Sequence, residues 1–111
     1  MTRDELASRH CAPHSGAIDR LTDAETAVLL AALPGWRIEN GQLARSFSFA
    51  DFDETMAFVN ALAWIARRED HHPDLAVGYG RCRIAWSTHD VGGLSMNDFV
   101  CAAKIEALIE L

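Results

Sequence analysis

The chain alternates three helix-start patterns with two hairpin patterns, and this order constrains the fold more than any other feature. Thr22, Asp51 and Ser95 are each followed three positions later by an acidic residue. Such a pair is typical of a capping box, in which the cap side chain and the third helical residue satisfy each other's backbone amides. The sequence therefore predicts three helices, and the first should end before the Pro-Gly pair at 34–35.

Strand patterns fill the intervals between these helices. The Asn-Gly pair at 40–41 lies between two runs that are typical of strands, which is a strong hairpin signal. Gly80 divides a second pair of runs in which apolar residues alternate. The four expected strands are residues 36–39, 42–49, 75–79 and 82–86. Hairpins pair strands antiparallel, so we predict an α+β domain in the order α-β-β-α-β-β-α, a four-stranded antiparallel sheet with three helices packed on one face.

Apolar spacing predicts which faces of the two longer helices are buried. The second helix carries one apolar stripe, made of Phe52, Met56, Val59, Ala63 and Ala66 and widened by Leu62 and Ile65. In the last helix, the residues expected to face the core are Phe99, Ala102, Ile105 and Ile109.

Residues 1–20 are predicted to be a flexible N-terminal tail ahead of one domain spanning residues 21–111. Polar and small residues dominate this stretch, and no hydrophobic period is visible. His10, Cys11 and His14 leave metal binding open as an alternative to an unstructured tail, although no second ligand pair stands at zinc spacing.

Composition excludes several classes of function. The formal charge is −6, and no cluster of Lys and Arg offsets it, so we expect no nucleic-acid partner. No apolar stretch is long enough to cross a membrane, and the N-terminus lacks the apolar core of a signal peptide. The three cysteines are odd in number and widely spaced, which is typical of reduced thiols and favours a cytoplasmic protein.

Side chains suited to proton transfer gather in the second half of the chain. The motif His-His-Pro-Asp occupies residues 71–74, and Tyr79, His89 and Asp98 follow it. Imidazole is the only side chain whose unperturbed pKa lies near neutrality, so it can give and take protons at working pH. This group of residues therefore favours proton-transfer chemistry on a small polar substrate.

The predicted hairpin brings these residues together. Its first strand begins just after the double histidine, and its second strand ends just before His89. Adjacent strands of a hairpin place such a start and such an end side by side. We therefore expect His71, His72 and His89 to line one pocket, with Asp98 within a side chain's reach.

Each of these residues also has a structural explanation. Asp98 completes the capping box of Ser95, and capping alone accounts for it equally well. Tyr79 fits a wall or core aromatic residue, and a helix end followed by His-Pro fits a surface turn. A metal site built from the three histidines is a further alternative, although adjacent histidines rarely chelate one ion.

The spacing from the double histidine to Asp98 resembles the signature of the pterin-4a-carbinolamine dehydratase family. The resemblance runs from about Leu21 to the C-terminus. Its motifs are Leu-Pro-Gly-Trp at 33–36, Arg-Ser-Phe at 45–47, His-His-Pro-Asp at 71–74, Thr-His at 88–89 and Gly-Leu-Ser at 93–95. It implies the same four-stranded sheet and a homodimer or homotetramer joined through sheet edges and helices.

Members of that family dehydrate 4a-hydroxytetrahydropterin to quinonoid dihydropterin without a metal or an organic cofactor. The resemblance implies that His71, His72 and His89 form the acid–base set. It also implies a pterin as the bound partner, and the residues expected to help bind it are Asp98, Tyr79, Asp70 and Thr88.

One position departs from the family pattern. Arg67 stands four residues before the first histidine, where an acidic residue is usual. An arginine there would lower the pKa of neighbouring imidazoles by like-charge repulsion, which predicts weakened dehydration. Some proteins of this fold belong to carboxysome gene clusters and assist RuBisCO assembly without catalysis. A chaperone with RuBisCO as its partner is therefore the alternative function.

Overall fold

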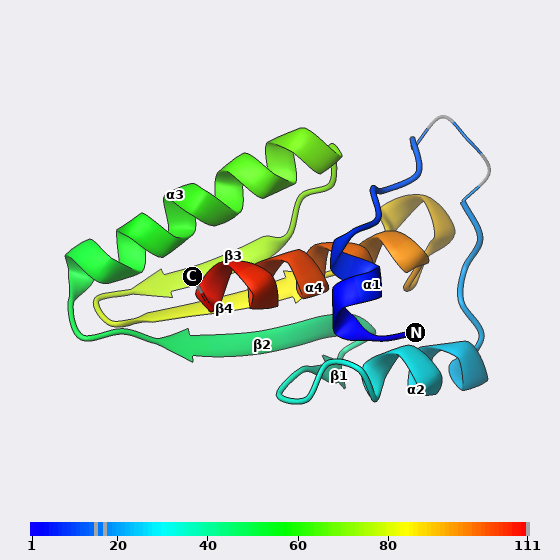
Figure 1. Ribbon diagram of the computed structural model, residues 1–111, viewed down its shortest axis with the longest axis horizontal. Coiled ribbons are helices and arrows are strands. Elements are labelled where there is room, and N and C mark those ends of the chain that lie inside the picture. Colours follow the sequence, from blue (N-terminus) through cyan, green and yellow to red (C-terminus); the bar gives the residue numbers. More distant parts are fainter. Residues whose placement is uncertain (15, 17, 111) are drawn as a thin grey trace.

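Four strands form one antiparallel sheet, and helices pack against it (Figure 1). The computed structural model describes residues 1–14, 16 and 18–110. Its elements in chain order are α1 (Arg3–Ala7), α2 (Asp23–Leu30), β1 (Arg37–Glu39), β2 (Gln42–Ser48), α3 (Phe52–Glu69), β3 (Asp74–Gly78), β4 (Arg81–Trp86), the 3-10 helix η1 (His89–Val91) and α4 (Met96–Ile109). The strand order is β1-β2-β4-β3, so β1 and β3 are the edges. The α+β class and the antiparallel sheet predicted from the sequence are confirmed.

The two hairpins have the turns that their sequences predict. Asn40 and Gly41 have φ angles of 51° and 76°, the left-handed pair that a two-residue hairpin turn favours. In the second hairpin Asp74, at the start of β3, pairs with Ala85, near the end of β4. The segments that precede β3 and follow β4 therefore meet at one end of the sheet.

The predicted helix starts are also present. Thr22 and Ser95 begin α2 and α4 with complete capping boxes. Asp51 begins α3 by accepting a hydrogen bond from the backbone N–H of Glu54 at 2.8 Å, without the reciprocal side-chain contact. Local capping chemistry thus sets where all three helices begin.

The buried stripe of α3 is rotated relative to the predicted one. Phe52, which was predicted to face the core, is 49% exposed. Thr55 is fully buried because its hydroxyl lies 2.9 Å from the carbonyl oxygen of Tyr79, which links α3 to the β3–β4 turn. The prediction missed Thr55 because it counted only apolar residues, and it missed Phe58 because it placed the stripe on the neighbouring face of the helix. The buried residues are Thr55, Phe58, Leu62 and Ala66.

The first residues of the chain form a helix and a docked segment, where the sequence predicts a tail without regular structure. A capping box between Thr2 and Glu5 begins α1, and Leu6 is fully buried. The side chain of Asn97 in α4 then binds the backbone of Ala12 twice, accepting from its N–H at 2.9 Å and donating to its carbonyl at 3.0 Å. The stretch is too short to show a period, although its Thr-x-x-Glu pattern is a capping signal.

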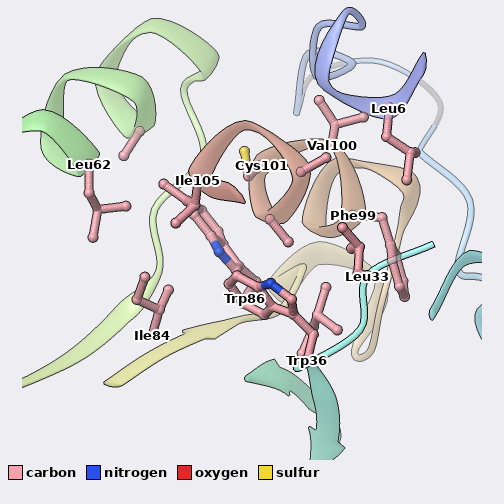
Figure 2. Packing of buried hydrophobic residues seen from close by; sticks show 14 of the residues in the cluster. Leu6, Leu33, Trp36, Leu62, Ile84, Trp86, Phe99, Val100, Cys101 and Ile105 are labelled. Carbon is pink, nitrogen blue, oxygen red and sulfur yellow. The ribbon is translucent and has the colours of Figure 1, made fainter. Parts of the chain in front are cut away.

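The helix α1 packs against α4 (Figure 1), and the first half of α4 is buried on all sides. Residues 97–103 are all buried, and Figure 2 shows Leu6 of α1 in one cluster with Phe99 and Val100 of α4. Ile109, which was predicted to face the core, is 40% exposed. Among the described residues, no helix is both long and apolar enough to cross a membrane.

Glu106 ties α4 to the first hairpin. Its carboxylate accepts a hydrogen bond from Nε1 of Trp36 at 2.6 Å and pairs with the guanidinium of Arg45. Gly35 has a φ of 97°, and a side-chain carbon there would lie 2.8 Å from Nη1 of Arg45. The left-handed conformation and the close guanidinium both favour glycine at this position. The motifs at 33–36 and 45–47 thus hold α4, and Asp98 with it, on the sheet.

Candidate active site

His71 and Asp98 form a buried pair at the end of the sheet where the second hairpin begins and ends. Nε2 of His71 lies 2.6 Å from Oδ1 of Asp98, and the two side chains are 3% and 0% exposed. An ionised carboxylate can only accept, so the histidine donates from Nε2. The structure therefore joins two predicted site residues that lie 27 positions apart in the chain.

The start of α4 holds the second oxygen of Asp98. Oδ2 accepts hydrogen bonds from the backbone N–H of Ser95 at 2.9 Å and from the hydroxyl of Thr88 at 2.8 Å. That hydroxyl lies 2.6 Å from the hydroxyl of Ser95. Asp98 thus serves both purposes that the sequence left open, because one oxygen completes the capping box and the other orients His71.

Backbone geometry and packing fix the place of His71. Asp70 ends α3 in the left-handed conformation, with φ 50° and ψ 44°. The backbone N–H of His71 then donates to the carbonyl of Ala66 at 3.1 Å, as in a helix C-cap motif. The imidazole stacks on the indole of Trp86 in β4, with ring centroids 5.3 Å apart and planes 17° apart. The ring is therefore fixed by a hydrogen bond at its edge and by an aromatic ring at its face.

A cleft of about 720 Å³ opens beside the same end of the sheet. Its lining combines residues from 20–30 with residues from 87–94, and it includes Asp74, Thr88 and His89. His89 is exposed at the start of η1, and His72 is exposed two residues before Asp74. The three histidines thus occupy different surroundings: His71 is buried, and of the three only His89 lines the cleft.

Two other predicted residues contribute less directly. Tyr79 lies in the β3–β4 turn and is 70% exposed. The five residues of β3 separate it from the double histidine, a span of roughly 16 Å at about 3.3 Å per strand residue. Within one chain the structure therefore does not bring Tyr79 to the His71–Asp98 pair. Asp70 immediately precedes His71, and its side chain is not part of the hydrogen-bond network around Asp98.

His14 reaches the site from the N-terminal segment, which the sequence analysis did not anticipate. Its ring centroid lies 5.4 Å from that of His71. Its Nε2 lies 2.8 Å from the carbonyl oxygen of Asp70, and its Nδ1 lies 3.2 Å from a carboxylate oxygen of Asp90. The only sequence signal was the cluster of His and Cys at 10–14. Within the described part of the chain, no group of three or more His, Cys, Asp and Glu side chains is placed to hold a metal ion.

Two further contacts dock the segment that carries His14. Glu69 accepts hydrogen bonds from Nδ1 of His10 at 2.9 Å and from the backbone N–H of Cys11 at 2.7 Å. Burial acts to raise the pKa of Glu69, but these hydrogen bonds outweigh it and hold the pKa below its usual range. The thiols of Cys11 and Cys101 lie 3.4 Å apart, and this contact together with burial raises the pKa of Cys101.

Comparison with known proteins shows the family to which the chain belongs. Residues 19–108 match the family model described as pterin 4 alpha carbinolamine dehydratase. The chain belongs to this family. A Stenotrophomonas maltophilia protein whose name assigns it to the pterin-4-alpha-carbinolamine dehydratases is 59% identical over 107 residues, or 95% of this chain and 92% of that protein. A Nitrosospira multiformis protein with the same name is 48% identical over 110 residues, or 99% of this chain and 97% of that protein.

Solved structures of dehydratase relatives have the same fold. A transcriptional coactivator/pterin dehydratase from Brucella melitensis is 35% identical, with a TM-score of 0.77 over 81% of this chain and 98% of that chain. A pterin dehydratase-like protein identified as a RuBisCO assembly factor in the alpha-carboxysome is 25% identical, with a TM-score of 0.58 over 68% of this chain and 90% of that chain. In this dehydratase-family chain, His71 and Asp98 lie inside the matched residues, whereas His14 lies before them.

Proposed function

We propose that the chain dehydrates 4a-hydroxytetrahydropterin to quinonoid dihydropterin by acid–base catalysis through histidines. The bond between C4a and the hydroxyl oxygen breaks, the hydroxyl takes up a proton and leaves as water, and a base removes the proton from N5. The substrate exchanges no electrons with another molecule, so one acid and one base are sufficient. Membership of the dehydratase family supports this reaction.

The buried His71–Asp98 pair is the observation that carries the proposal. Because Nε2 of His71 donates to Asp98, its Nδ1 is the nitrogen left to exchange a proton. His71 is buried and does not line the cleft, so we propose that it exchanges this proton with the substrate through the neighbouring His72 or His89. A carboxylate that fixes the tautomer and orientation of an imidazole is a recurring element of acid–base sites. Packing against Trp86 adds rigidity, so the proton-exchanging atom is held in one place.

The remaining members of the proposed site lie around this pair. His89 lines a cleft of about 720 Å³, which falls within the roughly 300–1,000 Å³ of small-molecule sites. We assign His89 and the exposed His72 to the pterin ring, as proton donor or acceptor. Thr88 both lines the cleft and donates to Asp98, so it links the bound substrate to the buried pair.

The test is the decay of the carbinolamine in a coupled aromatic amino acid hydroxylase reaction. We expect the parent protein to accelerate this decay and His72→Ala to slow it on the order of a hundredfold or more, the usual contribution of a general acid or base. Arg67→Glu should be faster than the parent. Arg68→Glu makes the same charge change at the next exposed position, so it is the matched control and should keep the parent rate.

A non-catalytic role in RuBisCO assembly is the second candidate. It is supported by the likeness to the assembly factor and by Arg67, which replaces the acidic residue usual in the family pattern. The likeness is weaker than that to the Brucella protein, at 25% against 35% identity. A parent no faster than buffer, with no gain in Arg67→Glu, would favour the assembly role over the enzyme.

We also propose that the chain forms a homodimer or homotetramer through an edge of the sheet. β3 is an edge strand, and all five of its residues are exposed. Leu75 and Val77 on it are 41% and 43% exposed. An open edge with apolar side chains invites pairing with another strand, and a second copy of the chain would cover it.

A further inference from the structure

His14 contacts both loops that carry the proposed acid–base histidines. Nε2 of His14 donates to the carbonyl of Asp70, the residue directly before His71, at 2.8 Å. On its other side, Nδ1 lies 3.2 Å from Oδ2 of Asp90, the residue directly after His89. A carbonyl oxygen and a carboxylate can only accept, so both contacts are hydrogen bonds when both ring nitrogens carry a proton. One ring then bridges residues 70–72 and residues 89–91, which are brought together only by the fold.

The contact at Asp70 bears on backbone conformation as well as on spacing. Asp70 is a non-glycine residue with a φ of 50°, a left-handed conformation that side chains other than glycine adopt at a cost. A hydrogen bond to its carbonyl oxygen fixes the peptide unit that leads into His71. The ring of His14 also lies beside that of His71, with centroids 5.4 Å apart.

His14 is not needed to dock the segment that carries it. Leu6 is fully buried, Asn97 binds Ala12 through two hydrogen bonds, and Glu69 binds Cys11. These anchors all precede His14 in the chain. The segment is therefore held on α4 by other contacts, and it presents the imidazole of His14 to the site.

We propose that His14 is a positioning residue that clamps the loops at 70–72 and 89–91 and thereby sets the place of His71. Its effect on catalysis rests on the dehydratase function proposed above. The residue lies outside the matched family residues 19–108, so this clamp adds to the site that the family match covers. Its loss should lower kcat about tenfold, because the clamp sets the place of the proton-transferring ring.

Three variants of the full chain test the clamp. His14→Ala removes both contacts, and His14→Gln keeps a side-chain N–H for the Asp70 carbonyl. His10→Ala removes an imidazole from the same segment, at a side chain that is 73% exposed, and it leaves the anchors at Cys11 and Ala12 in place, so it is the matched control. We expect His14→Gln to recover kcat to within threefold of the parent and His10→Ala to equal the parent.

Amide hydrogen exchange supplies a measurement independent of activity. The amides of His71 and Gly92 donate to the carbonyls of Ala66 and His89, so they report on the two loops. The amide of Ala12 donates to Asn97 and reports on docking of the segment. In His14→Ala we expect exchange at both loop amides to be at least fivefold faster, with Ala12 unchanged.

The outcomes separate the clamp from the proposed function. Unchanged exchange at both loop amides would overturn the clamp, and so would a kcat equal to that of an active parent. If exchange at Ala12 became faster in His14→Ala and equally fast in His10→Ala, the clamp would also be overturned. His14 would then only help to dock the segment. If the parent does not dehydrate the carbinolamine, the proposed function fails, and the exchange of the His71 and Gly92 amides alone decides whether the loops are clamped.

Discussion

Replacing Asp98 with asparagine separates the two roles of its carboxylate, because the amide keeps the shape and changes only the charge and one acceptor. The amide oxygen can take the place of Oδ2 and keep the hydrogen bonds from Ser95 and Thr88. The amide N–H₂ then faces Nε2 of His71, which must become an acceptor. The proton of His71 moves to Nδ1, the nitrogen that the proposal reserves for proton exchange.

The expected cost in stability is small, and the expected cost in activity is large. A hydrogen bond to a charged group contributes about 1.5–3 kcal/mol and a neutral one about 0.5–1.5 kcal/mol, so the exchange costs about 1 kcal/mol. For a domain of this size the melting temperature should fall by roughly 4 °C. With the wrong tautomer at a general acid or base, activity should fall a hundredfold to ten thousandfold, on the order of the whole contribution of such a group.

Ser95→Ala is the matched control for Asp98→Asn. It removes the hydroxyl cap of α4, which also costs about 1 kcal/mol, and it leaves the carboxylate of Asp98 on His71. We expect Ser95→Ala to melt at nearly the same temperature as Asp98→Asn and to retain activity within a few-fold of the parent. Nitrogen NMR of the His71 ring should find the proton on Nε2 in Ser95→Ala and on Nδ1 in Asp98→Asn. Equal activity losses in the two variants, or the same tautomer in both, would refute the reasoning.

Three further predictions concern the N-terminal segment and the sheet edge. Hydrogen bonds hold the pKa of Glu69 below its usual range, so ionised Glu69 stabilises the folded chain. This contribution to the free energy of unfolding is fully present above the pKa of glutamate in the unfolded chain, about 4.3, and it is lost as pH falls through the lower pKa of Glu69 in the folded chain. Urea unfolding should therefore find Glu69→Gln about 1 kcal/mol less stable at pH 7 and equal to the parent near pH 3, whereas a deficit at both pH values would contradict this. Diamide, which is reduced as two thiols join, should form an intramolecular Cys11–Cys101 disulfide slowly, because burial and the Cys11 contact raise the pKa of Cys101. Mass spectrometry of a digest that finds Cys11 joined instead to Cys82 or to another chain would show that the segment is not docked. Light scattering of the parent should give a dimer or larger, and Leu75→Lys with Val77→Lys should give a 12.2 kDa monomer; a monomeric parent at micromolar concentration would contradict the edge-pairing proposal.

The sequence predicted those parts of the fold whose signals are local. Caps at Thr22 and Ser95 and the turn at 40–41 involve residues within a few positions of one another, so their chemistry is visible along the chain. The hairpin pattern also indicated that the double histidine and His89 lie at one end of the sheet, because a hairpin determines which segments lie at its open end. The hydrogen bond between His71 and Asp98 was not among the predictions. Thr55 was missed because its burial depends on a carbonyl in a turn 24 positions away.

The N-terminal segment was missed for a different reason. Its attachment depends on tertiary contacts, such as those between Asn97 and Ala12, which no periodicity reveals. One signal was available in α4, where residues 99–103 are apolar without a polar face. A helix that is apolar all round must be covered on both sides, and only the segment before residue 21 remained to supply the second cover. The place of His14 beside His71 follows from that docking, and the cluster of His and Cys at 10–14 did not indicate it.

The most direct test of the central claim is the rate of carbinolamine decay with the parent and with His71→Gln at equal concentration. Glutamine at 71 can still donate to Asp98, so the hydrogen-bond network of α4 is kept while the proton-exchanging imidazole is lost. The account predicts that the parent accelerates decay well above buffer and that His71→Gln loses on the order of a hundredfold or more of that acceleration. A folded His71→Gln protein that dehydrates the carbinolamine as fast as the parent would contradict it.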